Sequence, residues 1–146
     1  MHCLTNVRLP DPLITNSESN YWRVYLNENQ IIDSILPMYA DFALPGANWK
    51  GDFLSPRAVD LQVNGGLGLA FPELTFEDMP KLFCLLDLLW QDGVEAISPT
   101  FVTCSATDLR KALLVLREAR KQHLSSRCKL LGAHLEGPFL SRKFIG

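Results

Sequence analysis

The chain has 146 residues, of which 47% are apolar and 21% charged, and its formal net charge is −2. This composition is typical of a soluble globular protein with one modest core. A slightly acidic chain without a run of lysine or arginine offers no binding surface for nucleic acid. Its apolar runs are short and interrupted by Asp, Gln and Gly, so we expect no membrane-spanning segment.

The cysteines are scattered along the chain and form no C-x-x-C pair; they are Cys3, Cys84, Cys104 and Cys128. This pattern does not indicate a zinc site, and it is typical of reduced thiols in a cytoplasmic protein. The opening sequence MHCLTN lacks the charged and apolar regions of a secretory signal. We therefore expect a cytoplasmic location.

Residues 1–53 are predicted to form a small antiparallel β region. Aromatic and β-branched residues predict strands over 3–9, 21–26 and 31–36, with a turn over 27–30. The prolines and glycines of residues 37–53 indicate a connection to the next region. Because a small sheet buries little apolar surface by itself, we expect this region to pack on another part of the protein.

From residue 54 the pattern changes to alternating strands and helices. Strands are predicted over 58–64, over 94–103 with a ragged end at Pro99, and over 129–135. One helix is expected to begin at Glu77 or Asp78 and to end at Gly93, and a second to follow a capping box that begins at Ser105. The predicted buried faces consist of Leu82, Phe83, Leu85, Leu86, Leu89 and Trp90 in the first helix, and of Leu109, Ala112, Leu113, Leu116 and Ala119 in the second. This order predicts right-handed crossovers and a parallel sheet.

Polar side chains stand at the carboxyl ends of the predicted parallel strands: Gln62 and Asn64, then Thr100 with Thr103, then Glu136. A Gly-Pro step follows Glu136 and must end its strand, since proline has no N–H and restricts the preceding residue. Ligands bind at this edge in parallel α/β proteins. Glu136 could bind a divalent ion or act as a general base, and Gln62 and Asn64 could orient a ligand or a water. The alternative for Glu136 is a solvated side chain in a surface loop.

His134 lies two residues before Glu136, so both side chains are expected on the same face of the strand. His134 could therefore point at the same site. The alternative is a packed histidine, or one that supports a ligand without being one. His123 follows the charged end of the second helix and is expected at the surface. A catalytic zinc usually needs three protein ligands, so the spacing alone gives no complete metal site.

Three sequence strings carry a family resemblance. The string His134-Leu135-Glu136-Gly137-Pro138-Phe139-Leu140 resembles the motif of N-acetylglucosamine-6-phosphate deacetylases in the amidohydrolase superfamily. The string from Asp60 to Gly68, DLQVNGGLG, resembles the first barrel strand and glycine turn of that family, and Pro99-Thr100 resembles the end of its second strand. The resemblance covers most of residues 54–146.

The resemblance implies an α/β fold, the beginning of a (β/α)₈ barrel with about three parallel strands and two helices. Residues 1–53 would then be part of a flanking β domain, and residues 54–146 the first part of the barrel. The implied reaction is hydrolysis of the acetamido group of N-acetylglucosamine 6-phosphate, a small-molecule substrate, by family members that form homo-oligomers. Glu136 matches the carboxylate that binds one divalent ion, zinc or iron. Gln62-Val63-Asn64 stands where many amidohydrolases have a His-x-His pair, which resembles the single-metal branch of the family.

The resemblance also implies that the other metal ligands and the catalytic aspartate of the family lie beyond Gly146. A (β/α)₈ barrel takes about 250 residues. We therefore expect the chain to be an N-terminal fragment that contains no catalytic residue and is inactive by itself. Two alternatives stay open: a small non-catalytic α/β domain that binds a sugar phosphate, and a remnant domain that completes the sheet of a partner through its open edge.

Overall fold

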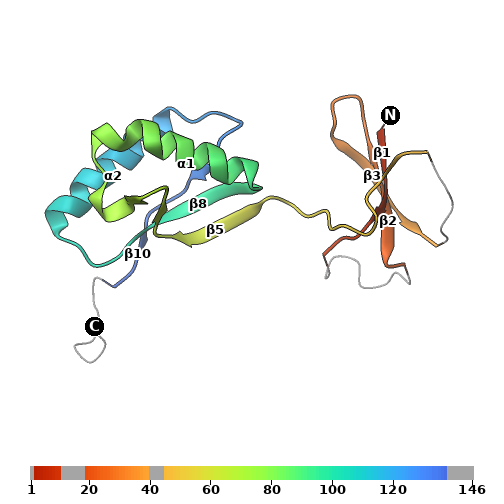
Figure 1. Cartoon of the computed structure of the whole chain (residues 1–146), viewed down its shortest axis with the longest axis horizontal. Helices are drawn as coiled ribbons and strands as arrows, with labels where there is room; N and C mark the ends of the chain where they lie inside the picture. The colour runs from red at the N-terminus through yellow and green to blue at the C-terminus, as the bar shows by residue number, and fades with distance from the viewer. Residues whose placement is uncertain (1, 11–18, 40–44, 138–146) are drawn as a thin grey trace. The chain divides into compact units, whose positions relative to one another are not determined.

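The computed structural model describes residues 2–10, 19–39 and 45–137. The chain divides into two compact units, Met1–Pro56 and Arg57–Gly146 (Figure 1). Within the described residues, no helix has the length and apolar character needed to cross a membrane.

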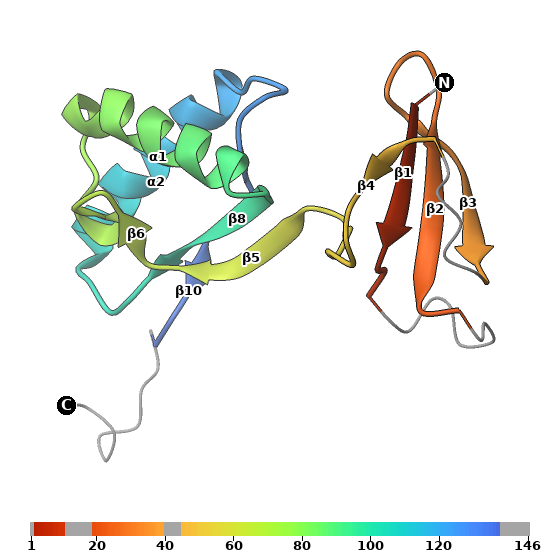
Figure 2. The ribbon, with the colours of Figure 1, turned by 45° about the vertical axis from the view of Figure 1, so that its right-hand side comes forward.

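The first unit contains a mixed sheet in the order β3-β2-β1-β4 (Figure 2). Strand β2 pairs antiparallel with both β1 and β3, and the short β4 pairs parallel with β1. The strands are β1 His2–Val7, β2 Tyr21–Leu26, β3 Ile32–Met38 and β4 Ala47–Asn48. The predicted antiparallel hairpin is therefore confirmed, and the strand predicted over 21–26 has its predicted bounds.

Two predictions for this unit were wrong. Strand β3 continues through Pro37 to Met38, although both residues were assigned to a connection. Proline is accepted there because β3 lies at the edge of the described sheet, where a missing N–H costs no ladder bond. Strand β4 also lies within the predicted connection. It is held by parallel pairing with β1, in which Leu4 lies opposite Ala47 and Thr5 opposite Asn48. Pairing between segments so far apart in the sequence leaves no local sequence pattern.

The second unit contains a parallel sheet covered by two helices, as the sequence predicted. The strand order is β10-β8-β5, with β9 also paired with β8, and every one of these pairings is parallel. The elements are β5 Ala58–Val63, α1 Met79–Gln91, β8 Val94–Phe101, α2 Ala106–Lys121, β9 Lys129–Leu130 and β10 His134–Leu135. Figure 1 shows both helices on the same side of β8, so one face of the sheet carries the helical layer.

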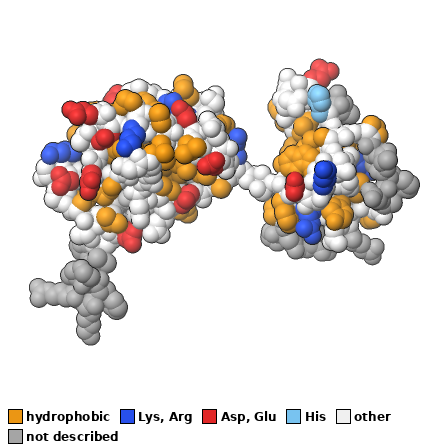
Figure 3. Space-filling view, in the orientation of Figure 1, with side chains coloured by type: hydrophobic (Ala, Val, Ile, Leu, Met, Phe, Trp, Pro, Cys, Tyr) orange, Lys and Arg blue, Asp and Glu red, His pale blue; other side chains and the backbone are white. Residues whose placement is uncertain are grey.

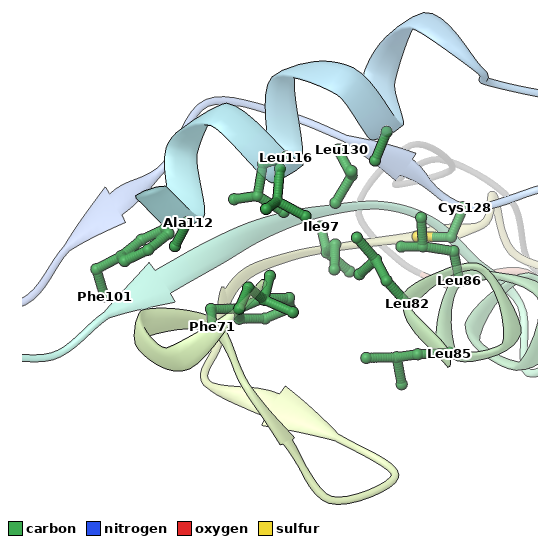
Figure 4. Packing of buried hydrophobic residues seen from close by; sticks show 13 residues of the cluster. Phe71, Leu82, Leu85, Leu86, Ile97, Phe101, Ala112, Leu116, Cys128 and Leu130 are labelled. Carbon is green, nitrogen blue, oxygen red and sulfur yellow. The ribbon is translucent and has the colours of Figure 1, made fainter. Parts of the chain in front are cut away.

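The glycine segment after β5 forms a small hairpin of β6 Gly65–Gly66 and β7 Leu69–Ala70, followed by the 3₁₀ turn η1 Phe71–Glu73. Gly65 has a φ of 153°, and a Cβ atom there would lie 2.0 Å from the carbonyl oxygen of Leu69. Only glycine permits this close approach. The hairpin delivers Phe71 to the core, where its side chain is fully buried (Figure 4).

Helix α1 begins at Met79, slightly later than predicted. The preceding residues form the 3₁₀ turn η2 Phe76–Asp78, which a reciprocal capping box between Thr75 and Asp78 holds in place. The predicted glycine cap is confirmed, since Gly93 has a φ of 85°.

Helix α2 has the predicted cap, because the Ser105 hydroxyl accepts a hydrogen bond from the Asp108 N–H at 3.1 Å. One residue of its predicted buried face was wrong. Leu113 is exposed, and Val115 is buried in its place. Val115 lies three residues after the buried Ala112 and therefore on the same face, whereas the adjacent Leu113 points about 100° away.

The strand predicted over 94–103, with a ragged end at Pro99, continues through Pro99 and ends at Phe101. Pro99 pairs with Val63 where the register between β5 and β8 shifts, and such a bulge accepts a residue without an N–H. The single strand predicted over 129–135 is instead divided into β9 and β10. The Ser98 hydroxyl donates to the Gly132 carbonyl at 2.6 Å, so a side chain replaces the ladder in this interval.

The core of the second unit lies between the helices and the sheet (Figure 4). Its fully or nearly fully buried side chains include Phe71, Leu82, Leu85, Leu86, Ile97, Phe101, Ala112, Val115, Leu116 and Cys128. Strand β5 contributes little to this core, and Val59 and Leu61 expose 52% and 64% of their surface. Hydrophobic side chains are visible on the surface of both units (Figure 3).

Candidate functional site

The candidate site lies at the carboxyl ends of the parallel strands. Glu136 directly follows β10, and its N–H donates to the Phe101 carbonyl at 2.8 Å, which continues the pairing with β8 by one residue. Gly137 then adopts a φ of 88°, so the chain leaves the sheet immediately after the carboxylate. The Thr103 hydroxyl donates to the Gly137 carbonyl at 3.2 Å and secures this turn. Glu136 is therefore held at the end of the strand, as the sequence predicted.

Gln62 and Glu136 are brought together across the sheet. The Gln62 Nε2 donates to the Glu136 Oε2 at 3.3 Å. Because β8 lies between β5 and β10, this hydrogen bond must cross one face of β8. The bulge in β5 helps to place Gln62, whose N–H turns to the Asp60 carboxylate at 3.0 Å. The amide and the carboxylate are both exposed, so the pair is open to a ligand.

Thr100 and His134 form a second contact between neighbouring strands. They are partners in the parallel register of β8 and β10, and the Thr100 Oγ1 lies 3.1 Å from the His134 Nδ1. The Thr100 side chain is fully buried, and His134 is half-buried. His134 is thus fixed from one side by a buried hydroxyl.

Asn64 is placed differently from Gln62. It lines a hollow of about 690 Å³ together with Thr100 and Thr103, near the first turn of α2. Its carbonyl accepts a hydrogen bond from the Phe71 N–H at 3.2 Å. Among the described residues no hydrogen bond joins Asn64 to Glu136, so the structure brings together Gln62 with Glu136 and Thr100 with His134, and leaves Asn64 apart.

Sequence reasoning missed Ser98. It lies two residues before Thr100, so both side chains point to the same face of β8. The Ser98 hydroxyl bonds to the Gly132 carbonyl and the Thr100 hydroxyl contacts His134, so both reach the segment that contains β9 and β10. The alternation of hydroxyl residues at positions 98 and 100 was the signal that could have identified it.

The described residues do not form a metal site by themselves. Nowhere in residues 2–10, 19–39 and 45–137 do three His, Cys, Asp or Glu side chains come close enough to hold an ion. Glu136 is one carboxylate, its side chain accepts a hydrogen bond from the Gln62 amide, and a catalytic zinc usually takes three protein ligands.

Sequence comparison identifies relatives of the chain, although no protein-family model matches it. It is 38% identical over 95 residues to the N-acetylglucosamine-6-phosphate deacetylase of Caenorhabditis elegans, an alignment that covers 63% of this chain and 22% of that protein. The enzyme of the same name from Haemophilus influenzae is 27% identical over 113 residues, covering 77% of this chain and 28% of that protein.

The chain is homologous to part of the N-acetylglucosamine-6-phosphate deacetylases. The resemblance seen in the sequence motifs is therefore confirmed. The alignment with the N-acetylglucosamine-6-phosphate deacetylase of Danio rerio spans 137 residues at 25% identity. The chain spans 22% to 33% of the length of these relatives.

Solved deacetylase structures share the fold of this chain. The enzyme from Pasteurella multocida aligns with a TM-score of 0.58 at 24% identity, covering 97% of this chain and 35% of that chain. The enzyme from Thermotoga maritima aligns with a TM-score of 0.62 at 23% identity, covering 97% and 33%. At this identity the likeness supports a shared fold, and the mixed α/β arrangement described above is that fold.

Proposed function

We propose that the chain is part of an amide hydrolase that removes acetate from N-acetylglucosamine 6-phosphate. In this proposal residues 54–146 begin a (β/α)₈ barrel and residues 1–53 belong to a flanking β domain. The protein acts in the cytoplasm as a homo-oligomer on a small-molecule substrate. The deacetylase relatives support the reaction and the substrate.

The observation that carries the proposal is the Gln62–Glu136 hydrogen bond across β8. It joins two of the sequence strings that resemble the deacetylases, although they are far apart in the chain. It also lies at the strand ends where barrel enzymes bind their substrates. An isolated surface glutamate, which was the alternative for Glu136, would not be held by a side chain from two strands away.

Within this site we assign Glu136 as one ligand of a single divalent ion, zinc or iron, that polarises the amide carbonyl in this class of hydrolase. Gln62 orients the carboxylate through its amide N–H. Because the described residues supply one ligand only, we place the remaining ligands and the catalytic acid–base residue outside them.

Acetate release by the complete gene product that contains this chain tests the proposal. The wild-type protein is expected to release acetate from N-acetylglucosamine 6-phosphate, and Glu136→Gln to reduce the rate by more than about 100-fold, since even residues behind the ligands contribute roughly 10- to 100-fold. Glu77→Gln is the matched control, because Glu77 is exposed in the same unit and its side chain forms no hydrogen bond or ion pair with the described residues. A wild-type protein that releases no acetate with either metal, or a Glu136→Gln protein that retains the wild-type rate, would contradict the proposal.

The metal content of the 146-residue chain gives a separate test. With Glu136 as the ligand contributed by the described residues, the purified chain is expected to retain much less than one zinc ion after dialysis, and to release no acetate. A stoichiometric, tightly bound zinc, measured by elemental analysis, would show that the ligand assignment is incomplete.

The hollow beside Asn64 favours a second function, non-catalytic binding of a sugar phosphate. Its lining combines Asn64, Thr103 and Lys111, which offer an amide, a hydroxyl and a cation, with the acidic residues Glu73 and Asp108. This function predicts that N-acetylglucosamine 6-phosphate raises the Tm of the chain in the presence of a metal chelator, and that Lys111→Ala removes the shift. An unchanged Tm would exclude it.

A further inference from the structure

The Thr100 hydroxyl has two polar neighbours and one proton. Its Oγ1 lies 3.1 Å from the Nδ1 of His134 and donates to the Ser98 carbonyl oxygen at 3.4 Å. The side chain is fully buried, so water cannot supply a third partner. The protons in the two contacts must therefore come from the Thr100 hydroxyl and the His134 imidazole, because the Ser98 carbonyl has none.

A carbonyl oxygen can only accept a hydrogen bond, and a threonine hydroxyl can donate one. When Thr100 donates to Ser98, the second proton has to come from the imidazole. We infer that Thr100 is a positioning residue that holds His134 in the tautomer with the proton on Nδ1. The Nε2 of His134 then carries a lone pair and serves as an acceptor.

The backbone pairing brings the two side chains next to each other. Thr100 and His134 are register partners, and the next pair is Phe101 with Leu135. The segment is also clamped on either side, by the Ser98 hydroxyl on the Gly132 carbonyl and by the hydrogen bond from the Glu136 N–H. The strand pairing therefore keeps Thr100 and His134 side by side, and their rotamers bring Oγ1 to Nδ1.

The consequence for binding rests on the proposed function. His134 and Glu136 are two residues apart at a strand end, so an imidazole acceptor and a carboxylate acceptor lie on the same face. Because Glu136 is assigned to the divalent ion, the Nε2 lone pair of His134 is the acceptor that is left for a proton donor of the substrate. His134 is thus assigned to accept a hydrogen bond from an O–H or N–H group of the substrate, beside the position of Glu136.

The tautomer can be measured directly on the ¹⁵N-labelled chain, because it contains only His2, His123 and His134. Long-range ¹H–¹⁵N spectra at pH 9, where ordinary imidazoles are neutral, distinguish a protonated from an unprotonated ring nitrogen. His134 is expected to show a protonated Nδ1 and an unprotonated Nε2, and its signals are assigned by their loss in His134→Asn. The exposed His2 and His123 are internal references for imidazoles in water.

Two substitutions test the role of the hydroxyl. Thr100→Val keeps the shape and removes the acceptor, so the His134 signals are expected to move to the tautomer ratio of the references. Thr100→Ser keeps the hydroxyl and is expected to retain the wild-type signals. Should Thr100→Val fail to fold, the wild-type and serine spectra still decide. A wild-type His134 with its proton on Nε2 would overturn the inference.

The outcome is separable from that of the proposed function, since the spectra need neither substrate nor metal. In the complete gene product, Thr100→Val is expected to lower kcat/KM by roughly 2- to 10-fold, the effect of one hydrogen bond, and Thr100→Ser to restore it. A protein with the Nδ1–H tautomer that releases no acetate would contradict the proposed function alone. A deacetylase with the Nε2–H tautomer would contradict the inference alone.

Discussion

Replacing Leu82 by alanine tests whether the core of the second unit is packed as described. Leu82 lies on α1, is fully buried, and belongs to the cluster that joins the helices to β8 (Figure 4). Removing its terminal carbon atoms takes away burial and leaves a cavity that the surrounding side chains fill only in part. Substitutions of this kind lower the free energy of unfolding by about 2–5 kcal/mol.

Leu88→Ala is the matched control, because it is the same substitution on the same helix. Leu88 is 41% exposed, so a smaller apolar area returns to water and no closed cavity forms. Its expected loss is about 1 kcal/mol, from the usual gain of roughly 1.5–3 kcal/mol for complete burial of a leucine. Helix propensity changes equally in both variants and cancels from the comparison.

Urea unfolding followed by circular dichroism at 222 nm measures the difference. Both described α-helices, α1 and α2, lie in the second unit, so the helical signal reports on that unit and not on the β unit. With a denaturant slope of about 2 kcal/mol/M, Leu82→Ala is expected to unfold at a urea concentration roughly 1 M lower than Leu88→Ala. Equal midpoints for the two variants would refute the packing described for α1.

Three further predictions concern single side chains. Ser105→Ala is expected to lower the stability by about 0.5–2 kcal/mol through loss of the α2 cap, whereas Ser125→Ala in an exposed turn has little effect in the same urea titration. A hydrogen bond from Arg127 lowers the pKa of Asp87 below the ordinary value of an aspartate. The ionised carboxylate therefore stabilises the fold above that ordinary value, and this stabilisation is lost as the pH falls through the lowered pKa. The Tm difference between wild type and Asp87→Asn should therefore shrink in acid, and a constant difference would contradict the pairing. Burial raises the pKa of the Cys128 thiol to about 11, so iodoacetamide at pH 8 is expected to label the exposed Cys84 first, as mass spectrometry would show; equal labelling would contradict the burial.

The elements that the sequence predicted well are those with a local physical cause. The aromatic and β-branched run of β2 fits a half-buried strand, and the apolar spacing of α1 and α2 fits helices that cover one face of a sheet. Gly93 and Ser105 also acted as predicted, because a helix cap depends on a few neighbouring groups. Sequence and structure agree where the interaction lies within one or two turns.

The elements that were wrong depend on distant partners. Strand β4 exists through pairing with β1, and Pro99 is accepted in β8 because the bulge lies in the neighbouring β5. The division of the last strand into β9 and β10 depends on a hydroxyl of β8. In each case the decisive group lies on another strand, where periodicity carries no information about it.

The site shows the same division. Motifs placed Gln62, Thr100 and Glu136 at one edge, because parallel strands share a direction. They could not show that Gln62 reaches Glu136 across β8 while Asn64 faces the hollow near α2, since the bulge in β5 alters the alternation of its side chains. The roles of these residues in binding a metal and a substrate stay predictions.

Strand β8 links the stability of the fold to the geometry of the site. Ile97, Pro99 and Phe101 are buried, and Ile97 and Phe101 belong to the core that faces the helices. The Ser98 and Thr100 hydroxyls point to the other face and contact Gly132 and His134, in the segment that contains β9 and β10. Because alternate residues point to opposite faces, a register slip of one residue would place the hydroxyls in the core and expose the apolar side chains. The core thus enforces the register that aligns Thr100 with His134. Any change that loosens the helix-facing side of β8 is therefore expected to disturb His134 as well, even though it removes no atom from the site.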